Sequence, residues 1–483
     1  MIAIDRVRKR ILSAINDRLS GVQGVLSISV VGSFLLSRSE EAFSDIDIVM
    51  VVRQISRDIH EHCVSVLSDL RCTDLGLQGY SVRVNPTFGP LKFNEPKTLV
   101  FHLMLYDRDG HRRHVIASPF TCFDWERTSA LFGPSLSQIY GAAPVQLGDL
   151  VNSRRGLASY LDDIERGAIT YREYLFCNAT CEQTTKTFPI DERHKQEYCY
   201  HIVHNMLRNY RKVVCRCNDS VAEDELAREL GSKDQSLSEY SGFLGQLCAW
   251  KRSGQHAPSR VMERTRSFLL GFSQHIDSLQ ASSPRIIFLR HAKTALNDGS
   301  FLGQGRDPEI AADTPNPPLD EDFDLVVTSS LKRASQTGGL LKGCPSHVVD
   351  RRLDEIDYGD ADGSSLSQLQ QRFPYIPEAW GRGEDPAFPG GESQAMVLCR
   401  LKQCLDDLVQ AHRSAKTAVV THNVVLRTLL GEVFTAPVAA WHRLQPRHLE
   451  PLEFQVVQGR LIPCLSGEQR TRFRDQLFLW GTT

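Results

Sequence analysis

Residues 286–289 form an apolar run that ends directly on Arg290 and His291. A run of β-branched and aromatic residues is typical of a buried strand, and this strand would deliver both polar side chains to its carboxyl end. Open α/β sheets bind their ligands at that edge. Because an arginine holds a phosphoryl group through forked hydrogen bonds and a histidine attacks it, the pair indicates phosphoryl chemistry.

Four later segments place further polar side chains beside apolar residues. Two of them predict strands that end on polar residues, one carries a carboxylate among apolar residues, and one predicts a turn before a helix. These segments are residues 326–337, 353–359, 388–393 and 419–423, with the two strands in the first and last and the carboxylate in the second.

The order of these segments resembles the histidine phosphatase superfamily, with its phosphoglycerate mutase-like fold, over roughly residues 284–483. The resemblance implies a three-layer α/β/α domain that hydrolyses a phosphate monoester without a cofactor. It implies that His291 becomes phosphohistidine and that Glu355 protonates the leaving oxygen and then activates water. It also implies a phosphate clamp of Arg290, Arg333 and His422, and a substrate contact from Asn297.

Two positions depart from the superfamily's pattern. The first motif usually runs Arg-His-Gly, and Ala292 stands in place of the glycine. Asn423 stands where a glycine often follows the second histidine. Neither change removes a catalytic group, and we expect both to narrow the pocket.

The amino-terminal part of the chain carries two aspartates at strand spacing. A predicted strand over residues 44–52 contains Asp45 and Asp47, whose side chains project from one face because they are two residues apart. Paired carboxylates on an apolar strand are costly unless neutralised, and a divalent metal is their usual partner. An earlier predicted strand breaks at Gly32-Ser33, which offers N–H groups and a hydroxyl to phosphates.

This Gly-Ser, spacer, Asp-x-Asp pattern resembles the polymerase β-type nucleotidyltransferase superfamily over roughly residues 20–110. The resemblance implies a small mixed-sheet α/β domain that uses Mg²⁺ and an NTP. The family has a third carboxylate on a later strand, here residues 97–107. His102 is the best-placed position there, and Asp107 is the acidic candidate for a metal ligand. The alternative is a surface hairpin with two exposed aspartates.

A helical segment is predicted between these two regions. Within it, residues 196–214 show an apolar face at helical spacing, and His201, His204, Arg208 and Arg211 form a second face. The second face either contacts an anionic substrate or is a solvated helix surface.

The whole chain of 483 residues predicts an α/β multidomain protein with domains at 1–145, 146–282 and 283–483. The net charge of −2 does not favour long nucleic acids as partners. No apolar run is long enough to span a membrane, and no apolar signal segment stands at the start. The thirteen cysteines have no metal-site spacing, so reduced thiols in a cytoplasmic protein are expected.

These observations predict a bifunctional enzyme. One part moves a nucleoside monophosphate from an NTP to a small acceptor, and the other is a phosphomonoesterase that acts on a small phosphorylated metabolite. Two alternatives stay open. The first domain either senses a nucleotide without turnover and gates the phosphatase, or it adenylylates a protein partner while the phosphatase acts independently.

Overall fold

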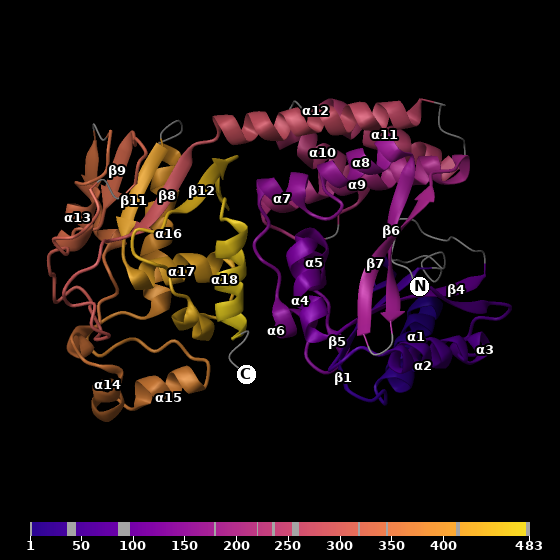
Figure 1. Ribbon diagram of the computed structural model, residues 1–483, viewed down its shortest axis with the longest axis horizontal. Helices are drawn as coiled ribbons and strands as arrows, with labels where there is room; N and C mark the ends of the chain where they lie inside the picture. The colour runs from indigo at the N-terminus through magenta and orange to yellow at the C-terminus, as the bar shows by residue number, and fades with distance from the viewer. Residues whose placement is uncertain are drawn as a thin grey trace. The chain divides into compact units, whose positions relative to one another are not determined.

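The computed structural model forms two compact units, residues 1–275 and 276–483 (Figure 1). A further division at residue 146, as predicted from the sequence, stays a prediction. The structure describes residues 2–35, 45–85, 97–177, 180–219, 221–233, 237–253, 260–316, 319–343, 346–411 and 416–479.

A mixed sheet forms the core of the amino-terminal unit. Its strands are β1 (Val25–Val31), β2 (Ile46–Val52), β3 (Ser81–Asn85), β4 (Thr98–Tyr106) and β5 (Ala130–Phe132). They lie in the order β3-β4-β2-β1-β5, with β2 and β4 parallel and β1 antiparallel to β2. All nine residues of β4 are buried, as an apolar strand between two neighbours requires. The mixed sheet agrees with the sequence prediction.

The periodic segment predicted from the sequence is one long helix, α9. Its apolar face is buried: Val203, Leu207 and Tyr210 are fully shielded from solvent. The helices of this region are α1 (Ile2–Leu19), α2 (Arg57–Ser68), α3 (Cys72–Leu75), α4 (Arg108–Ala117), α5 (Pro119–Trp125), α6 (Leu136–Tyr140), α7 (Leu147–Asn152), α8 (Leu157–Arg166), α9 (Glu192–Cys215), α10 (Glu223–Lys233), α11 (Ser238–Ser253) and α12 (Val261–Ser282).

A β-hairpin interrupts the segment that was predicted to be helical throughout. Its strands, β6 (Ala168–Cys177) and β7 (Thr180–Pro189), pair antiparallel over their whole length (Figure 1). Threonine, tyrosine and phenylalanine are frequent in both strands, and such residues favour extended backbone. The prediction of an all-helical segment is therefore wrong over residues 168–189.

The carboxy-terminal unit is built on a second sheet. Its strands are β8 (Arg285–Arg290), β9 (Leu325–Thr328), β10 (His347–Val349), β11 (Lys416–Thr421), β12 (Leu452–Val457) and β13 (Arg460–Pro463). They lie in the order β10-β9-β11-β8-β12-β13, and the first four are parallel. Because Thr421 pairs with Arg290 and Val420 with Thr328, the carboxyl ends of β8, β9 and β11 meet at one edge.

Helices follow the strands at the positions that the sequence predicted. Helix α13 begins at Lys332, α16 begins directly after the predicted turn, and α12 ends just before β8. None of the helices in the described ranges is both long and apolar enough to cross a membrane. The helices of this unit are α13 (Lys332–Gly338), α14 (Leu366–Arg372), α15 (Tyr375–Gly381), α16 (Gln394–Ala411), α17 (Asn423–Val433) and α18 (Gly467–Phe478).

Candidate active sites

His291 follows β8 and is buried, with 3% of its surface exposed. Its backbone N–H donates to the carbonyl oxygen of Thr421 (2.9 Å), which joins the ends of β8 and β11. The ring atom Nδ1 lies 2.6 Å from the carbonyl oxygen of Ala292. A carbonyl oxygen only accepts, so Nδ1 carries the proton and Nε2 keeps its lone pair. Burial, and then the charge of Arg333, hold the pKa of His291 well below its usual range, so the ring is neutral.

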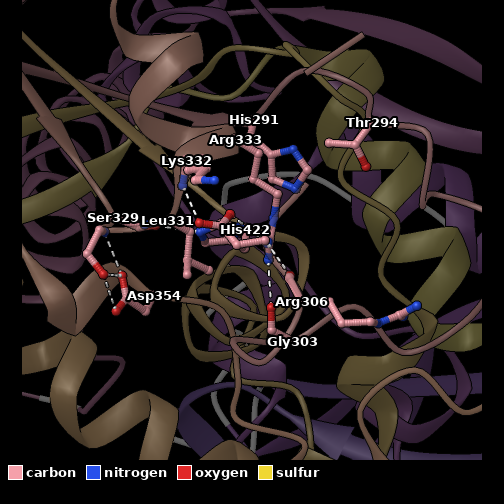
Figure 2. A network of polar contacts seen from close by, with 12 residues as sticks. His291, Thr294, Gly303, Arg306, Ser329, Leu331, Lys332, Arg333, Asp354 and His422 are labelled. Atoms are coloured by element: carbon pink, nitrogen blue, oxygen red, sulfur yellow. Dashed lines mark hydrogen bonds and ion pairs between the residues drawn. The ribbon is translucent and has the colours of Figure 1, made fainter. Parts of the chain in front are cut away.

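His422 and Arg333 lie close to His291 (Figure 2). The ring of His422, directly after β11, has its centroid 5.1 Å from that of His291. Its Nε2 lies 2.6 Å from the hydroxyl oxygen of Ser329, which follows β9. Arg333 is fully buried in the first turn of α13 and donates to the carbonyl oxygen of Gly303 (3.0 Å). Three neighbouring strand ends therefore supply this cluster.

Arg290 adds a second guanidinium group. Its Nη1 donates to the carbonyl oxygen of Pro446 (3.2 Å), and its shielded Nε has no hydrogen-bond partner among the described residues. Burial lowers the pKa of Arg290 to about 10, because the charged form loses water. Arg333 forms an ion pair with Asp307 (3.4 Å), and the charges of Glu355, Asp362 and Asp354 also act on it. Two desolvated guanidinium groups beside neutral imidazoles leave an excess of positive charge, which an anion would neutralise.

Glu355 is buried, with 4% of its surface exposed, at the amino-terminal end of α17. Its Oε1 accepts from the backbone N–H groups of Ile356 (3.0 Å) and Val424 (3.1 Å). Burial raises the pKa of Glu355 despite the opposing charge of Arg333. The neighbouring Asp354 is instead held by Ser330, whose hydroxyl lies 2.8 Å from Oδ2. Of these two carboxyl groups, Glu355 is the one that lines the cavity beside His291.

That cavity has a volume of about 420 Å³. Asn297 lines it as predicted, and its Oδ1 accepts from the backbone N–H of Thr294 (2.8 Å), which braces the loop after β8. Three further residues that were not predicted from the sequence also line the cavity: Tyr358, Arg427 and His448. The spacing of Arg427 four residues after Asn423 was a readable signal, since such residues share a helix face.

His448 is far from His291 in the sequence but lies next to it in the folded chain. Its Nδ1 lies 2.6 Å from the carbonyl oxygen of His291, and the two ring centroids are 5.3 Å apart. Burial lowers the pKa of His448 to about 4, so this ring is also neutral. No local pattern in the sequence marks this histidine, because its role depends on a contact across 157 residues.

A separate cavity of about 670 Å³ lies within the amino-terminal unit. Its lining brings together Gly32, Ser33, Asp45, Asp47 and His102. One potential ligand atom from each of Asp45, Asp47 and His102 lies within 4.8 Å of the others. Two carboxylates and an imidazole at this spacing suit one divalent cation.

His102 stands where a third carboxylate was expected. The parallel pairing of β2 and β4 sets it opposite Asp47, and its Nε2 lies 2.9 Å from Oδ1 of Asp45. Its Nδ1 lies 2.9 Å from the amide nitrogen of Asn85. This contact orients the ring so that Nε2 faces the aspartate pair.

Asp107 does not join this cluster. It caps α4, where its carboxylate accepts from the backbone N–H of Gly110 (2.6 Å). Five residues of extended chain separate it from His102, which is roughly 16 Å along a strand. The structure therefore does not support the prediction of Asp107 as a metal ligand, because the strand register presents His102 to the aspartates.

Gly32 makes room for one of the aspartates. Its φ is +81°, which side chains rarely adopt, and a Cβ there would lie 2.7 Å from Oδ2 of Asp47. Ser33 begins a short 3-10 turn, Ser33–Leu35, and lines the cavity. The predicted Gly-Ser break thus lies against the aspartate pair.

The lining also carries basic residues. The predicted polar face of α9 contributes His201, His204 and Arg208, whereas Arg211 turns to Asp219 (3.0 Å) and Glu229. Two further arginines, Arg154 and Arg172, lie 3.4 and 3.2 Å from Nδ1 of His114. The cavity is therefore lined by the carboxylates of Asp45 and Asp47 and by several arginines, of which Arg208 pairs with a further lining carboxylate, Asp124 (3.1 Å).

Comparisons with known proteins bear on the carboxy-terminal unit. A family model described as "Histidine phosphatase superfamily (branch 1)" matches residues 286–460. An uncharacterized phosphatase, PhoE, of Bacillus subtilis (strain 168) is 30% identical over 117 residues, which cover 24% of this chain and 55% of that protein. The chain thus spans about half the length of this relative.

Two further proteins are similar to part of this chain. Glucosyl-3-phosphoglycerate phosphatase of Mycobacterium tuberculosis (strain CDC 1551 / Oshkosh) is 30% identical over 182 residues, which cover 33% of this chain and 79% of that protein. The solved structure of YhfR from Bacillus stearothermophilus is 21% identical, with a TM-score of 0.35, and covers 38% of this chain and 97% of that chain.

Proposed function

Since this chain belongs to the histidine phosphatase superfamily through residues 286–460, we propose that it hydrolyses phosphate monoesters through a phosphohistidine at His291. The observation that carries the proposal is the hydrogen bond from Nδ1 of His291 to Ala292, which leaves the lone pair on Nε2. A buried, neutral imidazole with a fixed tautomer is a competent nucleophile at neutral pH.

The reaction has two steps. Nε2 of His291 attacks the phosphorus, the P–O bond to the alcohol breaks, and the leaving oxygen takes a proton from Glu355. Glu355 then removes a proton from water, the water oxygen attacks the phosphorus, and the P–N bond breaks to return its electron pair to Nε2. Arg290, Arg333 and His422 stabilise the charge on the equatorial oxygens, which is the main task in phosphoryl transfer.

The direct test is phosphate release by the full chain from a panel of monoesters, with His291→Asn as the variant. Asparagine keeps a polar side chain of similar size and has no nucleophilic ring nitrogen. We expect a loss of at least about 10³-fold in kcat. Retention of more than a few per cent of wild-type turnover would exclude His291 as the nucleophile.

For the amino-terminal unit, we propose nucleotidyl transfer from an NTP to a small anionic acceptor. The carboxylates of Asp45 and Asp47 fit Mg²⁺, which prefers oxygen ligands, and His102 adds a donor that also suits Mn²⁺. A bound divalent cation would neutralise phosphate oxygens there. Backbone N–H groups beside Gly32 and the hydroxyl of Ser33 would hold the triphosphate.

The basic part of the lining supports this choice of substrates. Burial lowers the pKa of Arg154 to about 10, and the charge of Arg172 acts in the same direction. Arg155 has a φ of 60°, outside the usual range for its residue type, so the loop holds it there at a cost. Clustered guanidinium groups are suited to bind phosphate oxygens.

The test uses the full chain with His291→Asn, so that phosphate esters are not consumed. Pyrophosphate release is followed for each NTP, with Mg²⁺ or Mn²⁺ and a mixture of phosphorylated acceptors. Metal-dependent pyrophosphate release supports transfer. Nucleotide binding without pyrophosphate release would favour the gated-sensor alternative, and labelling of added protein would favour adenylylation of a protein partner.

A further inference from the structure

The first two turns of α17 present two side chains to the phosphatase cavity. Asn423 and Arg427 are four residues apart, so they lie on the same face of the helix. Both line the cavity together with Glu355 and Tyr358. The mechanism proposed above uses neither of them.

Arg427 is held in place but carries an unmatched charge. Its Nε donates to the carbonyl oxygen of Leu444 (2.6 Å), which fixes the direction of the guanidinium group. It forms no ion pair with any residue in the described ranges. Burial lowers the pKa of Arg427, and the charges that oppose this effect are those of Tyr358 and then Glu355. Arg427 lines the same cavity as Glu355, the group that would protonate the leaving oxygen.

Arg427 stands outside the clamp that holds the phosphoryl group. Arg290 and Arg333 belong to that clamp, and the charge of Arg333 is also matched by Asp307 (3.4 Å). Among the described residues that line the cavity, Glu355 alone carries a carboxyl group, and its raised pKa favours the uncharged form. A desolvated guanidinium group without a counterion is costly, so an anionic group on the substrate would stabilise it.

Asn423 offers a second contact at the same end of the cavity. Its Oδ1 is shielded from solvent and has no hydrogen-bond partner among the described residues. A buried acceptor left unpaired is costly, and a donor on a bound molecule would remove that cost. Glycine often occupies this position in the superfamily. It would offer no hydrogen-bond acceptor and would not narrow the cavity.

We propose that Arg427 and Asn423 form a subsite for the leaving alcohol, and that preferred substrates carry a carboxylate or a second phosphate on that alcohol. Arg427 binds the anionic group, and Asn423 accepts a hydrogen bond from a hydroxyl beside it. This inference rests on the proposed hydrolysis at His291 and adds the class of substrate.

A matched pair of esters tests the charge. 3-Phosphoglycerate and glycerol 3-phosphate share a primary phosphate ester on a three-carbon chain, and differ by a carboxylate in place of a hydroxymethyl group. The readout is the ratio of their kcat/KM values, so a general loss of activity cancels. We expect wild type to prefer the carboxylate ester, and Arg427→Gln to lower the ratio by about tenfold or more.

Control variants separate charge from structure. Arg427→Lys keeps the charge and should retain more of the ratio than Arg427→Gln. Arg351→Gln removes an exposed arginine outside the cavity of the same unit and should leave the ratio unchanged. Arg427→Glu reverses the charge at this position. This variant should therefore prefer phosphoethanolamine, whose alcohol carries a cation, to 3-phosphoglycerate. Glycerol 1,3-bisphosphate, as a third ester, shows whether a second phosphate serves as well as the carboxylate.

A second pair of esters tests the hydrogen bond between Asn423 and the hydroxyl group of the substrate. The 3-phosphate ester of 3-hydroxypropanoate lacks the hydroxyl that 3-phosphoglycerate carries, and Asn423→Gly should narrow the gap in KM between the two.

A ratio in Arg427→Gln within about twofold of the wild-type ratio overturns the subsite, as does a wild-type enzyme without preference for the anionic ester. Both results leave hydrolysis through His291 standing, whereas full activity of His291→Asn removes the proposed function itself.

Discussion

The Nδ1 atom of His291 lies 2.6 Å from the carbonyl oxygen of Ala292, the next residue in the chain. This contact fixes the tautomer of the ring without a carboxylate partner. A histidine that pairs with an acid is pulled towards the protonated form, whereas this one is kept neutral by burial. The acid that the reaction needs must therefore be a different group, and the buried Glu355 has the raised pKa for that task.

The role of Glu355 as an acid predicts how its loss depends on the leaving group. An alkyl alkoxide needs a proton to depart, and a nitrophenolate hardly does. We expect Glu355→Gln to lower kcat by about 10²-fold or more for a sugar phosphate, and by less than about tenfold for p-nitrophenyl phosphate. Steady-state kinetics on both esters measure this. Equal losses would contradict the role and direct attention to other carboxyl groups near the cavity.

The raised pKa of Glu355 also predicts a cost in stability at higher pH. The folded state binds the carboxyl proton more tightly than the unfolded state, so this group's contribution is present below its usual pKa of 4.5 and is lost as pH rises through the folded value. Glu355→Gln has no proton to lose. Its midpoint of thermal unfolding should exceed that of wild type at pH 8, and the gap should shrink towards pH 4.5. If the difference in unfolding midpoint between Glu355→Gln and wild type did not change with pH, the carboxyl group of Glu355 would be ionised in the folded protein from pH 4.5 to pH 8.

Asp45→Asn with Asp47→Asn should remove metal-dependent NTP binding and leave phosphate release intact. The two carboxylates contribute to one cluster in the amino-terminal unit, and the phosphatase residues lie in a cavity of their own. Calorimetric titration with a non-hydrolysable NTP and Mg²⁺ measures the first activity, and EDTA should silence that activity alone. Loss of phosphate release in the double variant would favour the gated-sensor alternative.

Gly32→Ala should weaken NTP binding by about tenfold to a hundredfold, because its Cβ would push the carboxylate of Asp47 out of place. Gly79→Ala is the matched control. Gly79 has a similar φ of +73° and open space around it, so the substitution there brings the same backbone strain without the contact. Similar losses in both variants would mean that strain, and not the displaced carboxylate, is the cause.

Much of the phosphatase site was predictable because it lies at strand ends. The apolar run before Arg290 is β8, the run before His422 is β11, and parallel pairing brings their ends together. Local sequence marks both the strand and its end. The aspartate pair was found for the same reason, since alternation along a strand is readable without any tertiary contact.

The parts that escaped prediction depend on contacts between distant segments. His102 was named from the sequence as the best-placed position, whereas Asp107, the acidic candidate, does not reach the aspartates because of the register between β2 and β4. The hairpin of β6 and β7 lies between helices, in a segment that was predicted to be helical throughout. His448 reaches His291 only through the folded chain.

The measurement that tests the account most directly is trapping of the covalent intermediate. The full chain is mixed with a phosphate monoester, denatured within milliseconds at alkaline pH, digested and examined by mass spectrometry. We predict a phosphoryl group on the peptide that contains His291, stable to alkali and lost in acid, and absent from His291→Asn. Turnover of the same ester with no phosphorylated peptide, or with the phosphoryl group on another residue, would contradict the account.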